Sequence, residues 1–220
     1  MIEELLPFIV IGIIAVSIVY GMVHSHFSTK KRLANMEEVA NELGLSWSQT
    51  GSLDQISHSG FNLFNQGRAR KVSNLIEGVT DEVTIGIFDY QFTTGHGKHT
   101  RTTKQTVASL SSAQLGCPEF SMRPEGIFDR IGGMLGYQDI DFDSHPEFSK
   151  RFVLKGPNEE QIRAYFKPPV LEFFEKQAGI SVEGVGNAVC FYRTGKIVKA
   201  DEIKNLLADA YSVFGCLVDA

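Results

Sequence analysis

One glycine-containing stretch gathers most of the side chains that could do chemistry in this chain. It runs from Thr93 to Arg101 and places His96, Lys98 and His99 among two glycines. Glycine lets the backbone approach a ligand closely, and cationic donors beside it favour an anion such as phosphate. However, the spacing matches neither a P-loop nor a dinucleotide-binding turn. The stretch is therefore either an anion site or an ordinary exposed hairpin tip.

Three further cations extend this basic composition. Arg68, Arg70 and Lys71 lie directly before the strand predicted over Val72–Gly78. Together with Lys98 and Arg101 they form a candidate surface for anions or for the anionic headgroups of a membrane. Under this hypothesis, reversing the charges of Lys98 and Arg101 weakens binding of the domain to anionic lipid.

Asp89 is a carboxylate that the pattern places on a buried strand face. It continues the apolar face of residues 83–87, so it needs a partner or a raised pKa. One interpretation is a structural salt bridge or a backbone hydrogen bond. The alternative is a hydrolase or transferase that uses Asp89 with His96 or His99, which requires these groups to meet in one pocket.

The histidines and cysteines do not form a metal-binding pattern. His96 and His99 are three residues apart, but no cysteine or carboxylate stands at a recognisable ligand spacing beside them. Cys117, Cys190 and Cys216 are odd in number and widely spaced, which favours reduced thiols over a disulfide framework. We therefore predict no metal and no cofactor. The absence of a nucleophile motif favours a non-enzymatic protein without excluding an enzyme.

The N-terminus carries a membrane signal. Residues 5–23 contain no charged side chain, and the basic residues Lys30, Lys31 and Arg32 follow shortly afterwards. At about 1.5 Å per residue such a helix crosses the roughly 30 Å hydrocarbon core of a bilayer. The basic flank favours the cytoplasmic side, which places residues 1–4 outside. The pattern thus predicts a single-pass anchor with the following chain in the cytoplasm.

The rest of the chain is typical of an α+β protein, with antiparallel strands, several helices and a last helix packed on the core. We divide it into a basic segment and helix over 24–44, a β-rich half over 45–115 and a mixed half over 116–220. The two halves are either one domain or two.

Alternation and turn residues predict the strands Leu45–Gln49, Asn62–Phe64, Val72–Gly78, Val83–Phe92, Thr102–Leu110, Phe120–Met122, Phe152–Leu154, Ile180–Val182 and Ala188–Tyr192. Helical spacing predicts helices over 30–44, 124–135, 159–166, 170–176 and 203–217.

The charge balance limits the classes of partner that the chain is expected to bind. The formal net charge is −5, and a mildly acidic domain is not typical of nucleic-acid binding. The predicted partners are the lipid bilayer, through residues 5–23, and either a second protein or further copies of this chain.

Several sequence stretches carry a resemblance: RKVSNLIEG, IFDYQFTTGHGKHTRTTKQTVASL, FSMRPEG and FSKRFVLKG. With the N-terminal anchor, they resemble a widespread group of uncharacterised bacterial single-pass membrane-anchored proteins. The resemblance implies a bacterial plasma membrane and lends no catalytic residues. The function expected is therefore a membrane-tethered cytosolic domain with a binding or scaffold role. The enzyme and a sensor of anionic lipid surfaces remain the alternatives.

Overall fold

A single antiparallel sheet organises the protein. The computed structural model describes residues 32–54, 56, 60–126 and 136–220. Its strands are hydrogen-bonded in the order β1-β2-β3-β4-β8-β7-β5-β6, and every neighbouring pair is antiparallel. Strands from both halves of the chain join in this one sheet, and the predicted α+β class is confirmed. The strands are β1 (Ser46–Gly51), β2 (Arg68–Thr80), β3 (Val83–Thr94), β4 (Arg101–Ser111), β5 (Cys117–Pro124), β6 (Phe152–Lys155), β7 (Ser181–Gly186) and β8 (Ala188–Tyr192).

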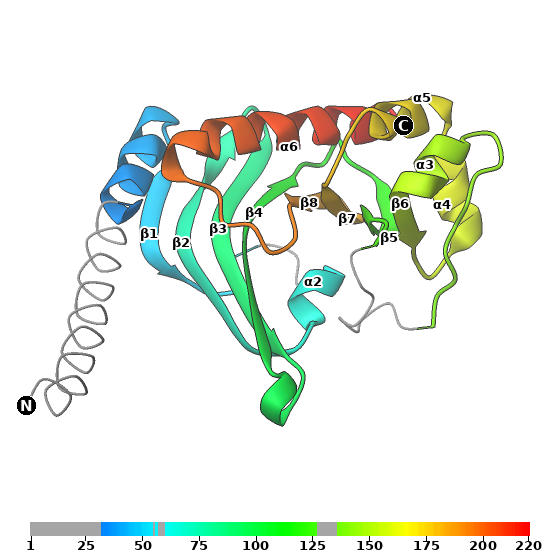
Figure 1. The fold of residues 1–220 in the computed structure, drawn as a ribbon. Coiled ribbons are helices and arrows are strands. Elements are labelled where there is room, and N and C mark those ends of the chain that lie inside the picture. Colours follow the sequence, from blue (N-terminus) through cyan, green and yellow to red (C-terminus); the bar gives the residue numbers. More distant parts are fainter. Residues whose placement is uncertain (1–31, 55, 57–59, 127–135) are drawn as a thin grey trace, which may run out of the picture.

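Helices cover one face of the sheet along most of its width (Figure 1). A helix over residues 32–42 precedes β1. The others are α2 (Asn62–Asn65), α3 (Pro146–Arg151), α4 (Glu159–Tyr165), α5 (Pro168–Glu175) and α6 (Ile203–Val218), with single 3-10 turns η1 (Gly97–His99) and η2 (Ala200–Glu202).

The last helix packs on the core, as predicted. Every residue of its apolar stripe is buried: Ile203, Leu206, Leu207, Ala210, Val213, Phe214 and Leu217. These side chains share one cluster with Ile85, Ile87 and Leu110 of the sheet. Burial of each leucine-sized side chain contributes roughly 1.5–3 kcal/mol, so this stripe is a main reason that α6 lies along the sheet.

Strand β3 is buried on both faces, which confirms the prediction from its alternation. Ile85 and Ile87 face the helical layer. Phe88, Tyr90 and Phe92 face the opposite side, where they form a second cluster with residues of α2. This second layer is small, because only α2 and its flanking residues cover that side in the described part of the chain.

The predicted strand Asn62–Phe64 is wrong, because these residues form α2. Three residues are too few for periodicity to separate a strand from a helical turn. Tertiary packing decides the outcome, since Leu63 and Phe64 are both buried in the second cluster. The sequence contains no local signal for this packing.

Two predictions concern helix boundaries. Asn158 begins α4 as predicted, because its side-chain Oδ1 accepts a hydrogen bond from the amide of Gln161 at 3.1 Å. Pro124, predicted to open a helix, is instead the last residue of β5, opposite Phe152. Proline is tolerated there because a strand end lacks a further ladder bond to lose. Residues 127–135 of that predicted helix lie outside the described residues.

The predicted membrane helix over 5–23 also lies outside the described residues. Within the part of the chain that the structure does describe, no helix is long and apolar enough to cross a bilayer. The helix predicted after the anchor is confirmed over residues 32–42 and ends at Gly44, which has a φ of +68°. Glycine adopts this left-handed conformation without strain.

Candidate functional site

Asp89 forms the centre of a polar cluster between β3 and the first described helix. Its carboxylate accepts hydrogen bonds from Arg32 Nη1 at 2.6 Å and Nη2 at 3.0 Å. Asn74 Nδ2 donates to it at 2.7 Å and Thr106 Oγ1 at 2.8 Å. The residue is only 8% exposed. Asp89 therefore has the structural ion pair that the sequence left as one of its two roles.

The local fold of β2 brings the amide side chain to this cluster. The register of β2 against β3 shifts between Ser73 and Ile76, and Asn74 has a φ of +53°. Asparagine tolerates this left-handed conformation better than most residues with a side chain. The third partner, Thr106, stands directly opposite Asp89 on β4.

The cluster also forms hydrogen bonds with the loop that follows β8. Arg32 Nη2 donates to the carbonyl of Val198 at 3.0 Å. The amide of Val198 in turn donates to Thr106 Oγ1 at 2.9 Å. One buried carboxylate thus organises the first described helix, three strands and the loop leading into α6.

A cavity of about 310 Å³ lies beside this cluster, lined by Arg32, Asn74, Asp89, Lys104 and Ile197 among others. Both carboxylate oxygens of Asp89 already accept two hydrogen bonds each. A carboxylate held in this way is poorly suited to act as a general base, because its lone pairs are occupied.

The two histidines do not join Asp89. His96 and His99 belong to the exposed turn around η1, beyond the ends of β3 and β4. Asp89 lies five residues before Thr94, the end of β3, which corresponds to roughly 16 Å along a strand. The structure therefore does not assemble the pocket that the hydrolase or transferase hypothesis requires.

The structure does bring the predicted basic residues together. Arg68 lies opposite Thr93, and Arg101 lies opposite Thr94 on the other side of β3. Arg68 Nη1 also donates to the carbonyl of Gly95 at 2.6 Å. Lys104, which the sequence analysis did not include, extends the same surface. We define the cationic tip as Arg68, Arg70, Lys71, Lys98, Arg101 and Lys104, all of which are exposed.

A bulge in β2 sets the direction of these cations. The register shifts between Arg68 and Lys71, and Ala69 has a φ of +50°. Because of the extra residue, Arg68 and Lys71 lie opposite Thr93 and Gln91, which point to the same face of β3 as Asp89. Two cations of the tip thus share the face on which Arg32 is bound.

Glu183 is a buried carboxylate that the sequence analysis missed. It is 1% exposed on β7, and its Oε1 accepts a hydrogen bond from Tyr192 Oη at 3.0 Å. Its Oε2 accepts one from the amide of Leu63 in α2, also at 3.0 Å. The available signal was an acidic residue within the apolar hairpin of residues 180–192. This carboxylate fixes α2 to the sheet.

Burial raises the pKa of Glu183 to about 7, because desolvation disfavours the charged carboxylate. The hydrogen bonds from Leu63 and Tyr192 and the charge of Arg123 oppose this shift. Such a pKa would suit a proton-transfer group. However, the side chain is enclosed between α2 and β8, so its contacts indicate a structural role.

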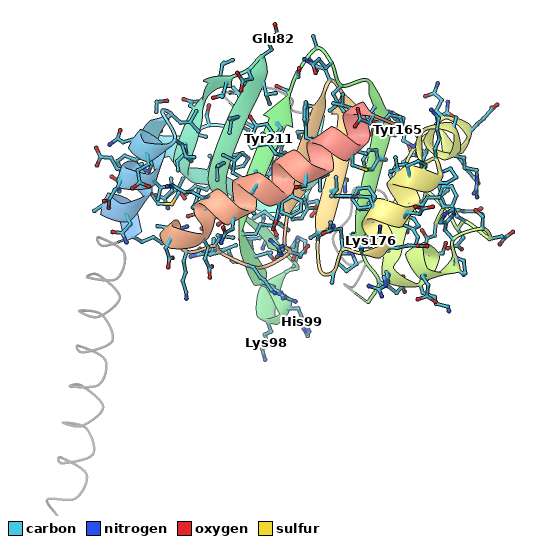
Figure 2. The ribbon with its side chains drawn as sticks, turned by 90° about the horizontal axis from the view of Figure 1, so that it is seen from above. Glu82, Lys98, His99, Tyr165, Lys176 and Tyr211 are labelled. Carbon is cyan, nitrogen blue, oxygen red and sulfur yellow. The ribbon has the colours of Figure 1, made fainter. Side chains whose placement is uncertain are left out.

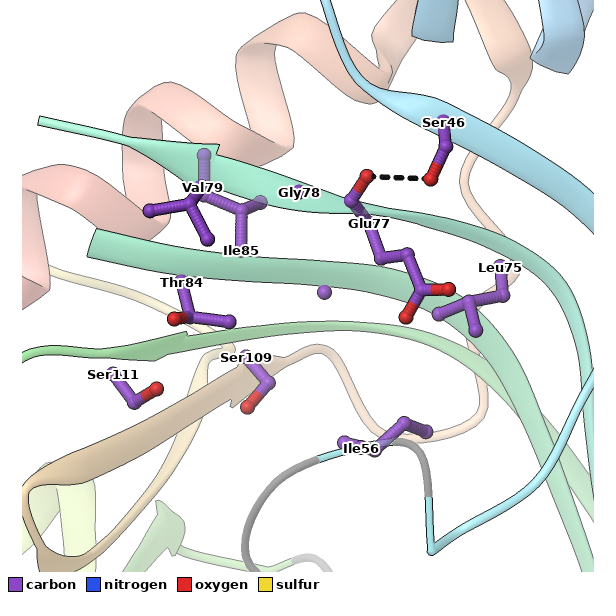
Figure 3. Close-up of a pocket in the computed structure, with 11 residues that line it drawn as sticks. Ser46, Ile56, Leu75, Glu77, Gly78, Val79, Thr84, Ile85, Ser109 and Ser111 are labelled. Atoms are coloured by element: carbon purple, nitrogen blue, oxygen red, sulfur yellow. Dashed lines mark hydrogen bonds between the residues drawn. The ribbon is translucent and has the colours of Figure 1, made fainter. Parts of the chain in front are cut away.

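A second cavity, of about 240 Å³, lies on the face of the sheet opposite to Asp89, beside the part that α2 covers. Figure 3 shows its floor on neighbouring strands, with the carboxylate of Glu77 and the hydroxyls of Thr84, Ser109 and Ser111 along it. Ile56 and Leu75 supply an apolar side. We call this feature the sheet groove. It offers hydrogen-bonding groups and one acidic side chain, so it suits uncharged polar groups better than anions.

The three cysteine thiols have low reactivity. Cys117, Cys190 and Cys216 are all free thiols. Burial raises the pKa of Cys117 and of Cys216 to about 11, so little reactive thiolate forms near neutral pH. Among the described residues, no three histidine, cysteine or acidic side chains are grouped to hold a metal ion.

The described residues form an antiparallel α+β domain. A helical layer covers one face of the sheet, and the smaller α2 layer covers part of the other. No family model matches the chain, and no curated protein matches it. The fold is similar to a solved structure, "crystal structure of the mycobacterial trehalose monomycolate transport factor A, TtfA", with a TM-score of 0.60. The likeness covers 86% of this chain and 93% of that chain at 11% sequence identity. At this identity it establishes a shared fold.

Proposed function

We propose that this chain is a membrane-tethered, non-enzymatic factor that binds lipid, or a protein that handles lipid, at the cytoplasmic face of a bacterial plasma membrane. The observation that carries the proposal is the fold likeness to a lipid transport factor, because it extends over nearly the whole of both chains. The apolar run over residues 5–23 and its basic flank support the tether and its orientation.

The contacts of the candidate catalytic residues favour binding over catalysis. Asp89 is held by Arg32, Asn74 and Thr106, and the two histidines lie apart from it on an exposed turn. Binding needs no such convergence, only an accessible surface. The sheet groove is one candidate surface for the polar part of a ligand.

Native mass spectrometry of the full-length chain released from detergent tests this proposal. We expect a retained lipid or a stoichiometric protein partner. Gly86→Val tests the groove, because Gly86 lines it and a Cβ there meets only ring atoms of Phe88 at ordinary contact distance. Loss of a lipid adduct in this variant would assign the adduct to the groove. A control substitution outside the groove is Gly116→Ala, where an added Cβ meets nothing within 4 Å.

Two results would contradict the proposal. One is a bare chain without lipid or partner in both detergent and lipid nanodiscs. The other is turnover of a substrate that is lost in the double variant His96→Ala and His99→Ala. Those side chains are exposed, so their removal is not expected to unfold the domain, and a loss of turnover would indicate chemistry.

A further inference from the structure

The neighbouring ends of β2, β3 and β4 at the η1 turn carry only positive charge. The segments 67–71 and 93–104 contain six cations and no acidic residue, in a chain of formal net charge −5. These six residues are the cationic tip, and all are exposed. Within the described residues, none of them forms an ion pair with a carboxylate. Their charge is therefore available to a partner.

The opposite end of the same strands is acidic. Asp81 and Glu82 form the exposed turn between β2 and β3. Figure 2 shows Glu82 at the end of the sheet opposite to Lys98 and His99. Strand β3 joins the two ends over 12 residues, which corresponds to roughly 40 Å. Charge is thus polarised along the strands.

The chain enters the domain on the side of the cationic tip. Arg32, at the start of the first described helix, is bound to Asp89. Lys71 and Lys104 of the tip lie opposite Gln91, two residues or roughly 7 Å further along β3. The sequence between the predicted anchor and Arg32 is residues 24–31. Eight residues reach at most about 28 Å. This tether keeps the tip within reach of the membrane surface.

We propose that the cationic tip docks on anionic lipid headgroups of the bilayer that anchors the chain, and that this contact points Asp81 and Glu82 into the cytoplasm. Lysine and arginine side chains near an anionic leaflet are attracted to it within a Debye length. The short tether raises the effective concentration of the tip at the surface, so a weak attraction is sufficient.

The inference rests on the proposed function only for the anchor and its cytoplasmic side. It adds a specific lipid contact and an orientation of the domain. Retention of a lipid or a partner, measured by mass spectrometry, does not depend on this orientation. The two proposals are therefore tested separately.

Energy transfer in nanodiscs measures the orientation directly. The full-length chain carries a donor dye at His99→Cys or at Glu82→Cys, and the lipids carry a headgroup acceptor. Cys216→Ser is included in both variants, because Cys216 is partly exposed whereas Cys117 and Cys190 are buried. We expect higher transfer from position 99 than from position 82 in phosphatidylglycerol-containing nanodiscs. The difference should shrink in phosphatidylcholine alone and at high salt.

A charge-matched pair of variants tests the role of the tip. Lys98→Glu with Arg101→Glu should remove the part of the transfer that depends on phosphatidylglycerol. Lys167→Glu with Lys176→Glu changes the net charge equally at the exposed ends of α5 and should leave it intact. Figure 2 labels Lys176 on the helical layer, away from the tip. The proposal would be overturned if transfer from position 99 were equal in nanodiscs with and without phosphatidylglycerol. It would also be overturned if the two double variants lost transfer to the same extent.

Discussion

At the residue scale, the two buried carboxylates of the described residues, Asp89 and Glu183, have structural roles. Asp89 holds the start of the first described helix through Arg32. Glu183 holds α2 through the amide of Leu63. Both side chains accept hydrogen bonds from groups distant in sequence, so neither partner follows from local spacing. An isolated acid on an apolar strand face signals that a partner exists, and it does not identify that partner.

Replacing Asp89 with asparagine should lower the free energy of unfolding by about 3 kcal/mol, because the partly buried guanidinium of Arg32 loses its charge partner. Chemical denaturation of the full-length chain in detergent, followed by circular dichroism, measures this change. Glu147→Gln is the matched control, since it breaks an exposed pair with Lys150. That control should change stability by at most about 1 kcal/mol. Similar values for the two variants would contradict the role given to Asp89.

Glu183 predicts a pH dependence of stability. Its folded pKa of about 7 lies above the ordinary 4.5, so the folded state binds the proton more tightly than the unfolded state. The stabilising contribution is therefore fully present below about pH 4.5 and is lost as the pH rises through about 7. The loss is on the order of 3 kcal/mol.

Thermal unfolding of the wild type and of Glu183→Gln at several pH values isolates this contribution from that of other carboxylates. The stability difference between the two proteins should change between pH 5 and 7.5, in the direction that makes the variant relatively more stable at the higher pH. A difference that stays constant over this range would show that Glu183 does not titrate as described.

At the element scale, amphipathic spacing carries most of the predictive information. The stripe of α6 is visible in the sequence and is buried in full. The alternation of β3 likewise indicates a strand covered on both faces. The prediction of a strand over Asn62–Phe64 fails, because three residues are too few for periodicity and their conformation in α2 depends on packing against Phe88 and Tyr90.

Because α6 is packed on the core, shortening one of its buried side chains should strongly lower the free energy of unfolding. Leu206→Ala should destabilise the protein by about 2–5 kcal/mol, because Leu206 is fully enclosed in the main cluster and the removed atoms leave a cavity. Lys204→Ala on the same helix removes an exposed contact with Glu42 and should cost less than about 1 kcal/mol. Denaturant midpoints compare the two. Equal midpoints would mean that α6 contributes little to the core.

At the scale of the whole molecule, the strand order could not be derived from the sequence. Predicted strands from residues 45–115 and from the second half pair side by side, with β4 next to β8 and β5 at some distance from β4. Periodicity defines which face of a strand is buried and carries no information about its neighbours. The basic residues illustrate the same limit: the sequence identified Arg68, Lys98 and Arg101, and only the sheet shows that they form one end opposed to Asp81 and Glu82.

We propose above all that this domain, tethered to the membrane, acts on lipid by binding and not by catalysis. The most direct measurement is the lipid composition of a strain that lacks the chain, compared after complementation with the wild type or with the double variant His96→Ala and His99→Ala. We expect an altered lipid pool that both proteins restore. An unaltered pool, or restoration by the wild type alone, would contradict it.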